Sequence, residues 1–185
     1  VHGSVSTIIG GIRALLLQAA HPAALAGVTH HSRYSSDFYG RLQGTSKWMT
    51  IVTFGAQPLI DKEMARVNAM HSKVTGSYTK QDGSKSSYRA QDERFLLWVH
   101  CAFTDSFLAA YEFLNGPLKT DPDEYVSEWA KSAQPLGLNW APQSRNELNL
   151  TIADFIEKDL SYTESTAEVV TLIMKPPFGR IARFF

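Results

Sequence analysis

The chain has 185 residues, the length of one domain of ordinary size. Its residues are 44% hydrophobic and 19% charged, which supplies enough apolar material for a core. Lys and Arg total 18, as do Asp and Glu, and no long basic tract occurs, so nucleic acid is not an expected partner. The one cysteine, Cys101, excludes an intrachain disulfide framework, a multi-cysteine zinc site and the C-x-x-C-H attachment of covalent haem. One cysteine fits either side of a membrane, so the compartment stays open, with the cytoplasm slightly favoured.

The most hydrophobic stretch, at 8–28, is long enough to span a bilayer. Arg13, Gln18 and His21 lie inside it, and such groups are costly in lipid, so a buried helix of a soluble core is the preferred interpretation. A membrane-spanning helix is the alternative. The chain begins at Val1 and ends on two phenylalanines, so we expect it to be a piece of a longer chain.

Apolar residues recur at spacings of three and four along most of the chain, which predicts helices. The expected ranges are 4–29, 46–57, 62–76, 89–115, 122–135, 145–159 and about 164–174. Pro22 lacks a backbone donor and should kink or break the first of them. The stretch WMTIVTF at 48–54 is rich in β-forming residues, but no alternating strand of convincing length occurs. The expected fold is all-α: a single-domain bundle over 1–185 of about six to eight helices, with at most two short strands.

Several helix starts carry capping signals. Asp121 is a candidate N-cap, and Pro122 after it suits the first helical position. Ser144 and Ser161 each stand three residues before a glutamate, as in a capping box. The stretch at 78–92, YTKQDGSKSSYRAQD, is polar and contains Gly and Ser, which predicts a loop. Residues 78–90 are expected to be the least ordered internal segment.

The common catalytic motifs are absent. The sequence contains no dinucleotide-binding or phosphate-binding glycine motif, no H-E-x-x-H and no G-x-S-x-G. It has no Glu-x-x-His pair and no glutamate before Glu63, so a di-iron carboxylate centre is improbable.

Histidines on apolar helical faces remain as candidates. His71 shares a stripe with Met64, Val67 and Val74, while His21 and His100 lie in other apolar helical segments. A core histidine bonded to a backbone carbonyl is the ordinary explanation for any one of them. The alternative is a metal ligand inside an apolar cavity, because a neutral imidazole is a good axial ligand for haem iron.

Ordered motifs over most of residues 8–135 resemble one family of helical proteins. The family comprises the latex-clearing rubber oxygenases and the fungal oxygenases that cleave a farnesyl side chain in mycophenolic acid synthesis. The motifs are R-A-L-L-L-Q-x-x-H-P at 13–22, H-S-x-Y-x-x-D at 31–37, G-R-L-x-x-T at 40–45, V-T-F-G at 52–55, RVNAMHSKVTG at 66–76 and LLWVHCAFTDSFLAAYE at 96–112.

The resemblance implies an all-α fold enclosing an apolar pocket for haem b, bound without covalent linkage. It also implies that His71 is the axial iron ligand and that Arg41 and Thr45 belong to the haem site. Each assignment has an alternative. Arg41 could bind a haem propionate with its planar fork or pair with Asp37, and Thr45 could contact a propionate or an iron ligand, or cap a helix beginning near Ser46.

Asp105 is a further candidate with several possible partners. It could orient His100 or His21, or it could pair with Arg13. A structural partner is the usual finding for a lone carboxylate of this kind.

Two departures from the rubber oxygenases bear on chemistry. That group has a glutamate upstream of the arginine as its proposed base, and a lysine beside the threonine; here no such glutamate exists and Gly44 stands before Thr45. The upstream polar residues are instead Gln18, His21, His30 and His31. His21 is therefore the candidate distal proton carrier.

The resemblance predicts a haem-dependent oxygenase-like protein that uses O₂ on an apolar, unsaturated small molecule, with a possible electron donor as partner. Two alternatives remain. One is a haem carrier or sensor without turnover, and the other is a haem-free helical binding module of the same fold.

Overall fold

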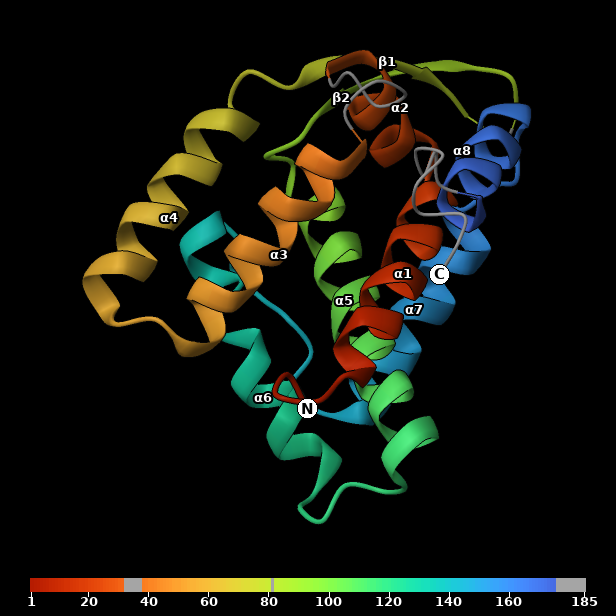
Figure 1. Cartoon of the computed structure of the whole chain (residues 1–185). Coiled ribbons are helices and arrows are strands. Elements are labelled where there is room, and N and C mark those ends of the chain that lie inside the picture. Colours follow the sequence, from red (N-terminus) through yellow and green to blue (C-terminus); the bar gives the residue numbers. More distant parts are fainter. Residues whose placement is uncertain (32–37, 81, 176–185) are drawn as a thin grey trace, which may run out of the picture.

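The computed structural model describes residues 1–31, 38–80 and 82–175. These residues form eight α-helices, one short 3₁₀ helix and a two-stranded antiparallel sheet, which confirms the mainly α fold (Figure 1). The helices are α1 (Ser6–Ala19), α2 (Pro22–His31), α3 (Phe38–Phe54), α4 (Gln57–His71), α5 (Glu93–Asn115), α6 (Pro122–Ala130), η1 (Gln134–Leu136), α7 (Arg145–Lys158) and α8 (Glu164–Met174), and the strands are β1 (Thr75–Thr79) and β2 (Lys85–Arg89).

Helix α5 is the central element, with α1, α6 and α7 packed around it. Trp98 and Phe107 of α5 are fully buried, and α1 approaches α5 closely at its small residues Gly10 and Ala14. A Cβ atom on Gly10 would lie 2.7 Å from Cδ1 of Phe107, so only glycine fits this contact without displacement. Small residues on α1 therefore set how closely the two helices pack.

The chain bends sharply between α1 and α2, as Pro22 predicts. The two helix axes differ by 103°, measured from Ser6–Ala19 to Pro22–Thr29. Within the described ranges no single helix is long and apolar enough to cross a membrane, although this bent pair meets the same criteria when its two helices are taken together.

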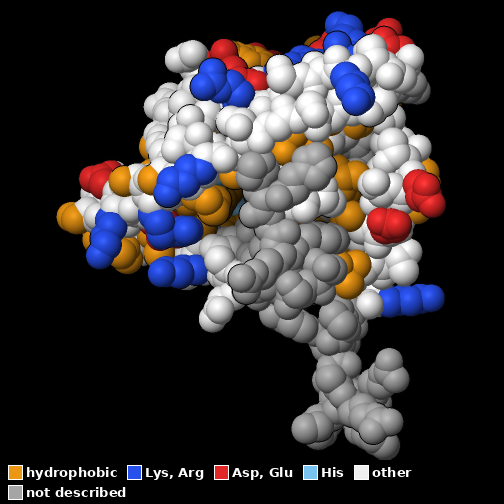
Figure 2. All heavy atoms as spheres, turned by 90° about the horizontal axis from the view of Figure 1, so that it is seen from above, with side chains coloured by type: hydrophobic (Ala, Val, Ile, Leu, Met, Phe, Trp, Pro, Cys, Tyr) orange, Lys and Arg blue, Asp and Glu red, His pale blue; other side chains and the backbone are white. Residues whose placement is uncertain are grey.

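Helices α3 and α4 run antiparallel, side by side (Figure 1). The β-rich stretch at 48–54 is helical, as its spacing of apolar residues predicts, because Trp48, Met49 and Val52 share one face that packs against α5 and α6. The opposite side of this pair carries the exposed hydrophobic residues Leu59 and Met70. Figure 2 shows hydrophobic and basic side chains mixed at this side, on the left of the view.

The predicted loop at 78–92 is wrong, because β1 and β2 form a β-hairpin there. Thr75 pairs with Arg89 and Thr79 with Lys85, and Gly83 turns the chain with a φ of 82°. Tyr88 is only 2% exposed and packs on Ala23 and Ala26 of α2. The composition hides this anchor, since apart from Tyr78 the other residues of the two strands are polar or glycine and mostly exposed. Residue 81 lies outside the described residues.

Helix starts follow the capping signals in two of three cases. The Asp121 side chain accepts a hydrogen bond from the Asp123 backbone N–H at 3.0 Å, and the Ser144 hydroxyl accepts one from the Glu147 N–H at 3.1 Å. The bounds of α8 confirm the predicted range of about 164–174, but the predicted cap at Ser161 is wrong, because Thr163 caps the helix in a reciprocal box with Thr166. Helix α6 also ends at Ala130, short of the predicted 135.

Candidate functional site

The apolar stripe of α4 is present, with His71 at its C-terminal end. Met64 and Val67 are 4% and 7% exposed, and His71, one turn further, is half-buried in the last turn of the helix. The backbone N–H of Val74 donates to the His71 carbonyl at 3.0 Å where the chain leaves the helix. Val74 then packs beside Tyr88 under α2. The spacing therefore predicts the buried face correctly, but its last two members stand at and beyond the helix end.

Thr45 lies inside α3, which begins at Phe38, so it does not cap a helix near Ser46 and that alternative is wrong. Its half-buried side chain precedes Trp48 and Met49 by one helical turn on the same face. The ring centroid of Trp48 lies 6.2 Å from that of Phe103 on α5. Thr45 therefore sits beside the inner face of α3.

Arg41 lies one turn before Thr45 in α3, but its side chain is outside the described part of the structure, as is the whole of Asp37. The choice between a propionate and Asp37 as its partner stays a prediction.

The antiparallel packing of α3 and α4 brings the start of α3 and the end of α4 to the same end of the pair (Figure 1). At 1.5 Å per residue, position 41 and His71 each stand roughly 20 Å from the connection between the two helices. Thr45 stands roughly 14 Å from it, one turn closer. The three positions that sequence motifs single out thus lie at similar heights along the pair, two on α3 and one on α4.

His21 occupies a different place, at the N-cap of α2. It is 1% exposed, and its Nδ1 accepts a hydrogen bond from the Ala23 backbone N–H at 3.2 Å. Its ring centroid lies 5.2 Å from Phe95 and 6.4 Å from Trp98, both on α5. Burial lowers the pKa of His21 to about 4; the charge of Asp159 opposes this shift.

The remaining polar candidates in α5 have structural partners. His100 is 7% exposed, its Nε2 lies 3.4 Å from the Thr104 hydroxyl, and burial lowers its pKa to about 4. Asp105 pairs with Arg13 of α1 at 2.5 Å, which confirms that alternative.

Sequence reasoning missed the aromatic residues that surround the inner face of α3. The His2 ring lies 4.4 Å from Trp129 of α6, and its Nε2 is 3.2 Å from the Tyr125 hydroxyl. Trp48 lies 6.3 Å from the same Trp129. His2 precedes the first helix and so has no periodic signal, whereas Trp48 belongs to the stripe that contains Thr45.

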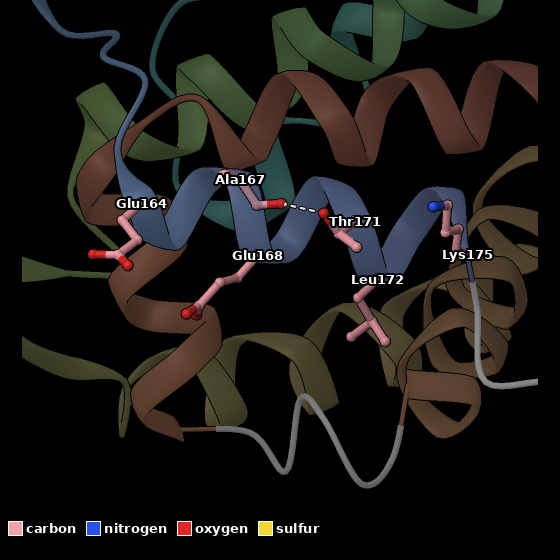
Figure 3. Close-up of a pocket in the computed structure, with 6 residues that line it drawn as sticks. All are labelled: Glu164, Ala167, Glu168, Thr171, Leu172 and Lys175. Atoms are coloured by element: carbon pink, nitrogen blue, oxygen red, sulfur yellow. Dashed lines mark hydrogen bonds between the residues drawn. The ribbon is translucent and has the colours of Figure 1, made fainter.

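An open hollow of about 510 Å³ lies on α8. Figure 3 shows the six residues that line it. It contains none of the predicted site residues, and its described lining comprises Glu164, Ala167, Glu168, Thr171, Leu172 and Lys175. Glu164, Glu168 and Lys175 are exposed charged groups, so this hollow is not the apolar pocket that the sequence predicts.

Comparison with known proteins identifies the family. A family model described as the catalytic domain of the ER-bound oxygenase mpaB/B′ and rubber oxygenase matches residues 1–185. A search of curated proteins and a search of solved structures each returned no match. The match covers the whole chain and agrees with the helical fold and with the motifs at 13–22, 40–45 and 66–76. The chain therefore belongs to the mpaB/rubber oxygenase catalytic-domain family.

Proposed function

We propose that this chain is a haem b-dependent oxygenase domain that uses O₂ to oxidise or cleave an apolar, unsaturated small molecule, with His71 as the axial iron ligand. The observation that carries the proposal is that one end of the α3–α4 pair gathers the motif positions 41, 45 and 71 in a chain of this oxygenase family. An electron donor is the further partner that such chemistry would use.

The described residues of the α3–α4 pair fit a haem group in two respects. His71 offers a half-buried imidazole at the edge of the buried apolar face formed by Met64 and Val67. The Nε1 of Trp48, one turn after Thr45 on the same face of α3, is buried without a hydrogen-bond partner among the described residues. A buried donor of this kind suits a group that carries oxygen acceptors.

His71 would hold the iron through one ring nitrogen, since a metal-bound imidazole must be neutral at that atom. Arg41 and Thr45 would hold the propionates, because a guanidinium binds a carboxylate with two parallel hydrogen bonds and a hydroxyl adds a third. Anchors on α3 and an iron ligand on α4 would fix the group from two helices.

Haem b, when bound, supplies O₂ binding and activation toward an unsaturated carbon. The protein's part would be to orient the substrate and exclude water, and the buried aromatic rings beside α3 form an apolar core next to the proposed site. Phe103 stacks on Phe107 with centroids 5.6 Å apart, and Trp129 lies edge-on to Phe107 at 6.3 Å. An apolar setting of this kind favours a hydrocarbon over a polar substrate.

The sequence predicts that His21 carries a distal proton, but the hydrogen bond that its Nδ1 accepts supports a narrower role. Its Nδ1 accepts the Ala23 N–H, so a proton could be added there only by breaking the cap of α2. Near neutral pH the low pKa keeps the ring uncharged. At neutral pH His21 therefore offers a hydrogen-bond donor at Nε2, and proton transfer by this residue would require the cap of α2 to open.

A haem carrier or sensor is the second candidate function. The pairing of Glu63, the first glutamate of the chain, with Arg66 favours this function. Glu63 is 5% exposed, and both its oxygens accept hydrogen bonds from Arg66, at 2.6 and 3.0 Å. Arg66 lowers the pKa of Glu63, which makes this carboxylate a weaker base than a free one.

The test is an absorption spectrum of the protein purified from cells supplied with haem, followed by O₂ consumption with a reductant and a long-chain alkene. The proposal predicts a Soret band and alkene-dependent O₂ uptake above that of free haem at equal concentration. A Soret band without alkene-dependent uptake supports the carrier, and a colourless protein after haem supplementation contradicts both functions.

A further inference from the structure

Four elements meet around His21, and we call this place the His21 junction: the end of α1, the start of α2, Phe95 and Trp98 of α5, and Phe155 of α7. Trp98 and Phe155 are fully buried, with ring centroids 5.1 Å apart, and His21 lies 6.4 and 6.3 Å from them. The junction is thus an aromatic interior in which any polar atom needs a partner.

Two polar atoms of this interior have no hydrogen-bond partner among the described residues. They are Nε2 of His21 and Nε1 of Trp98, from side chains that are 1% and 0% exposed. Burying such a group without a partner costs about 1–3 kcal/mol, so native proteins nearly always supply one.

The tautomer of His21 decides what kind of partner is needed. Because Nδ1 accepts the Ala23 N–H at 3.2 Å, the proton of the neutral ring sits on Nε2, which is therefore a donor. The indole Nε1–H of Trp98 can only donate. Two neighbouring donors of this kind cannot satisfy each other and both require an acceptor.

Two further polar atoms at the same place lack a partner in the described part of the structure: an amide nitrogen, which can only donate, and a hydroxyl, which can donate or accept. Gln18, one turn before His21, has a buried Nε2 without a partner, and the Ser161 hydroxyl is likewise buried without one in the described ranges. The Ser161 backbone N–H donates to the Ala20 carbonyl at 2.9 Å, which fixes Ser161 beside His21. The excess of donors points to a ligand rich in acceptor capacity.

We propose that the His21 junction is a binding site for a neutral oxygen acceptor, held by the Nε2–H of His21 and the Nε1–H of Trp98. An ordered water molecule has this chemistry and accepts two hydrogen bonds while it donates to a third group such as the Ser161 hydroxyl. The carbonyl or hydroxyl oxygen of a small organic molecule has it too. This site is separate from the proposed haem site on α3 and α4 and does not depend on it.

The test uses NMR on the whole ¹⁵N-labelled chain. A long-range ¹H–¹⁵N spectrum is expected to show His21 with a protonated Nε2 and an unprotonated Nδ1 between pH 6 and 8. The Trp98 indole N–H, assigned with Trp98→Phe, is expected to show a rotating-frame Overhauser contact to a long-lived water. Trp140, which is 49% exposed, is the control and should show only fast solvent exchange.

Variants then connect the two donors. His21→Phe keeps an aromatic ring and removes the Nε2–H donor, so the water contact of the Trp98 indole should be lost. If this variant does not fold, His21→Asn replaces it, because asparagine can still cap α2. Contacts from Trp98 to carbon-bound protons, with a small molecule released on denaturation, support an organic oxygen ligand instead of water. A His21 proton on Nδ1, or a Trp98 indole without water or ligand contacts in the wild-type protein, overturns the proposal.

Discussion

The His21 junction and the α3–α4 pair each place a histidine at a helix end beside apolar residues, yet the surroundings of the two side chains differ. His21 is 1% exposed, bonded through Nδ1 to the backbone and enclosed by aromatic rings. His71 is half-buried at the end of α4, at the edge of its apolar stripe. The first arrangement makes an imidazole part of the core, and the second leaves it near a surface where a cofactor can approach. Both histidines stand at a helix end, so the depth of burial is what distinguishes them.

The largest expected effect compares the tryptophans of the two regions. Trp98→Ala should reduce the free energy of unfolding by about 3–5 kcal/mol, because a fully buried ring leaves a cavity that the four surrounding elements cannot fill. Trp48→Ala on α3, where the ring is half-buried, should cost clearly less. Urea denaturation of both variants measures this, and equal losses would show that the α3 face is as tightly packed as the junction.

Acid should destabilise the junction and α5 through their neutral histidines. His21 and His100 have pKa values lowered by burial from 6.5 to about 4, so between these values the unfolded chain binds protons that the folded chain does not. The contribution of the two neutral histidines to the free energy of unfolding is therefore fully present above pH 6.5. It is lost as the pH decreases toward 4, by roughly 3 kcal/mol for each histidine. Denaturation curves from pH 7.5 to 4.5 measure the slope. His21→Asn should flatten it, and an unchanged slope in that variant would mean that His21 titrates normally.

The contact between α1 and α5 beside the junction can be tested with two neighbouring glycines. Gly10→Ala places a methyl group 2.7 Å from Phe107 and should cost about 1–3 kcal/mol by overpacking. Gly11→Ala, with nothing within 4 Å, should instead stabilise the helix by roughly 0.5–1 kcal/mol. Thermal unfolding distinguishes the two, and the same sign for both would contradict the close packing of α1 on α5.

The smallest effect is expected at the rim of that contact. Asp105→Asn removes the charge that pairs with Arg13, but the two side chains are 24% and 42% exposed, so the loss should stay below about 1 kcal/mol. Arg13 also keeps its hydrogen bond to the Ser106 hydroxyl, at 2.9 Å. A much larger loss in urea denaturation would mean that Asp105 has a second role, such as orienting His100.

The sequence predicts most of the fold, because spacing and caps are local properties. Pro22 marks the bend between α1 and α2, and the stripe at Trp48, Met49 and Val52 outweighs a β-rich composition. The hairpin was missed since its main anchor, Tyr88, is one buried residue among polar neighbours. Its burial depends on α2, some 60 residues earlier in the chain.

The candidate site is predictable in part for the same reason. Motif order identifies positions 41, 45 and 71, while the antiparallel packing that gathers them arises from tertiary structure. The tautomer of His21 depends on its hydrogen bond with the Ala23 N–H, and the aromatic surroundings of Trp98 depend on Phe155 of α7. Both contacts arise in the folded chain, so the spacing of residues does not predict them. The spacing of apolar residues alone does not distinguish His21 from His71 as a candidate ligand.

The most direct test of the central claim is the absorption spectrum of His71→Ala beside that of His21→Ala, both purified from cells supplied with haem. His71→Ala should remain helical and lose the Soret band or most of its intensity, and added imidazole should restore it by replacing the missing ligand. His21→Ala, changed in the junction, should keep the band. A His71→Ala protein with wild-type haem content and an unchanged spectrum would contradict the assignment of His71 and leave His100 as the next candidate.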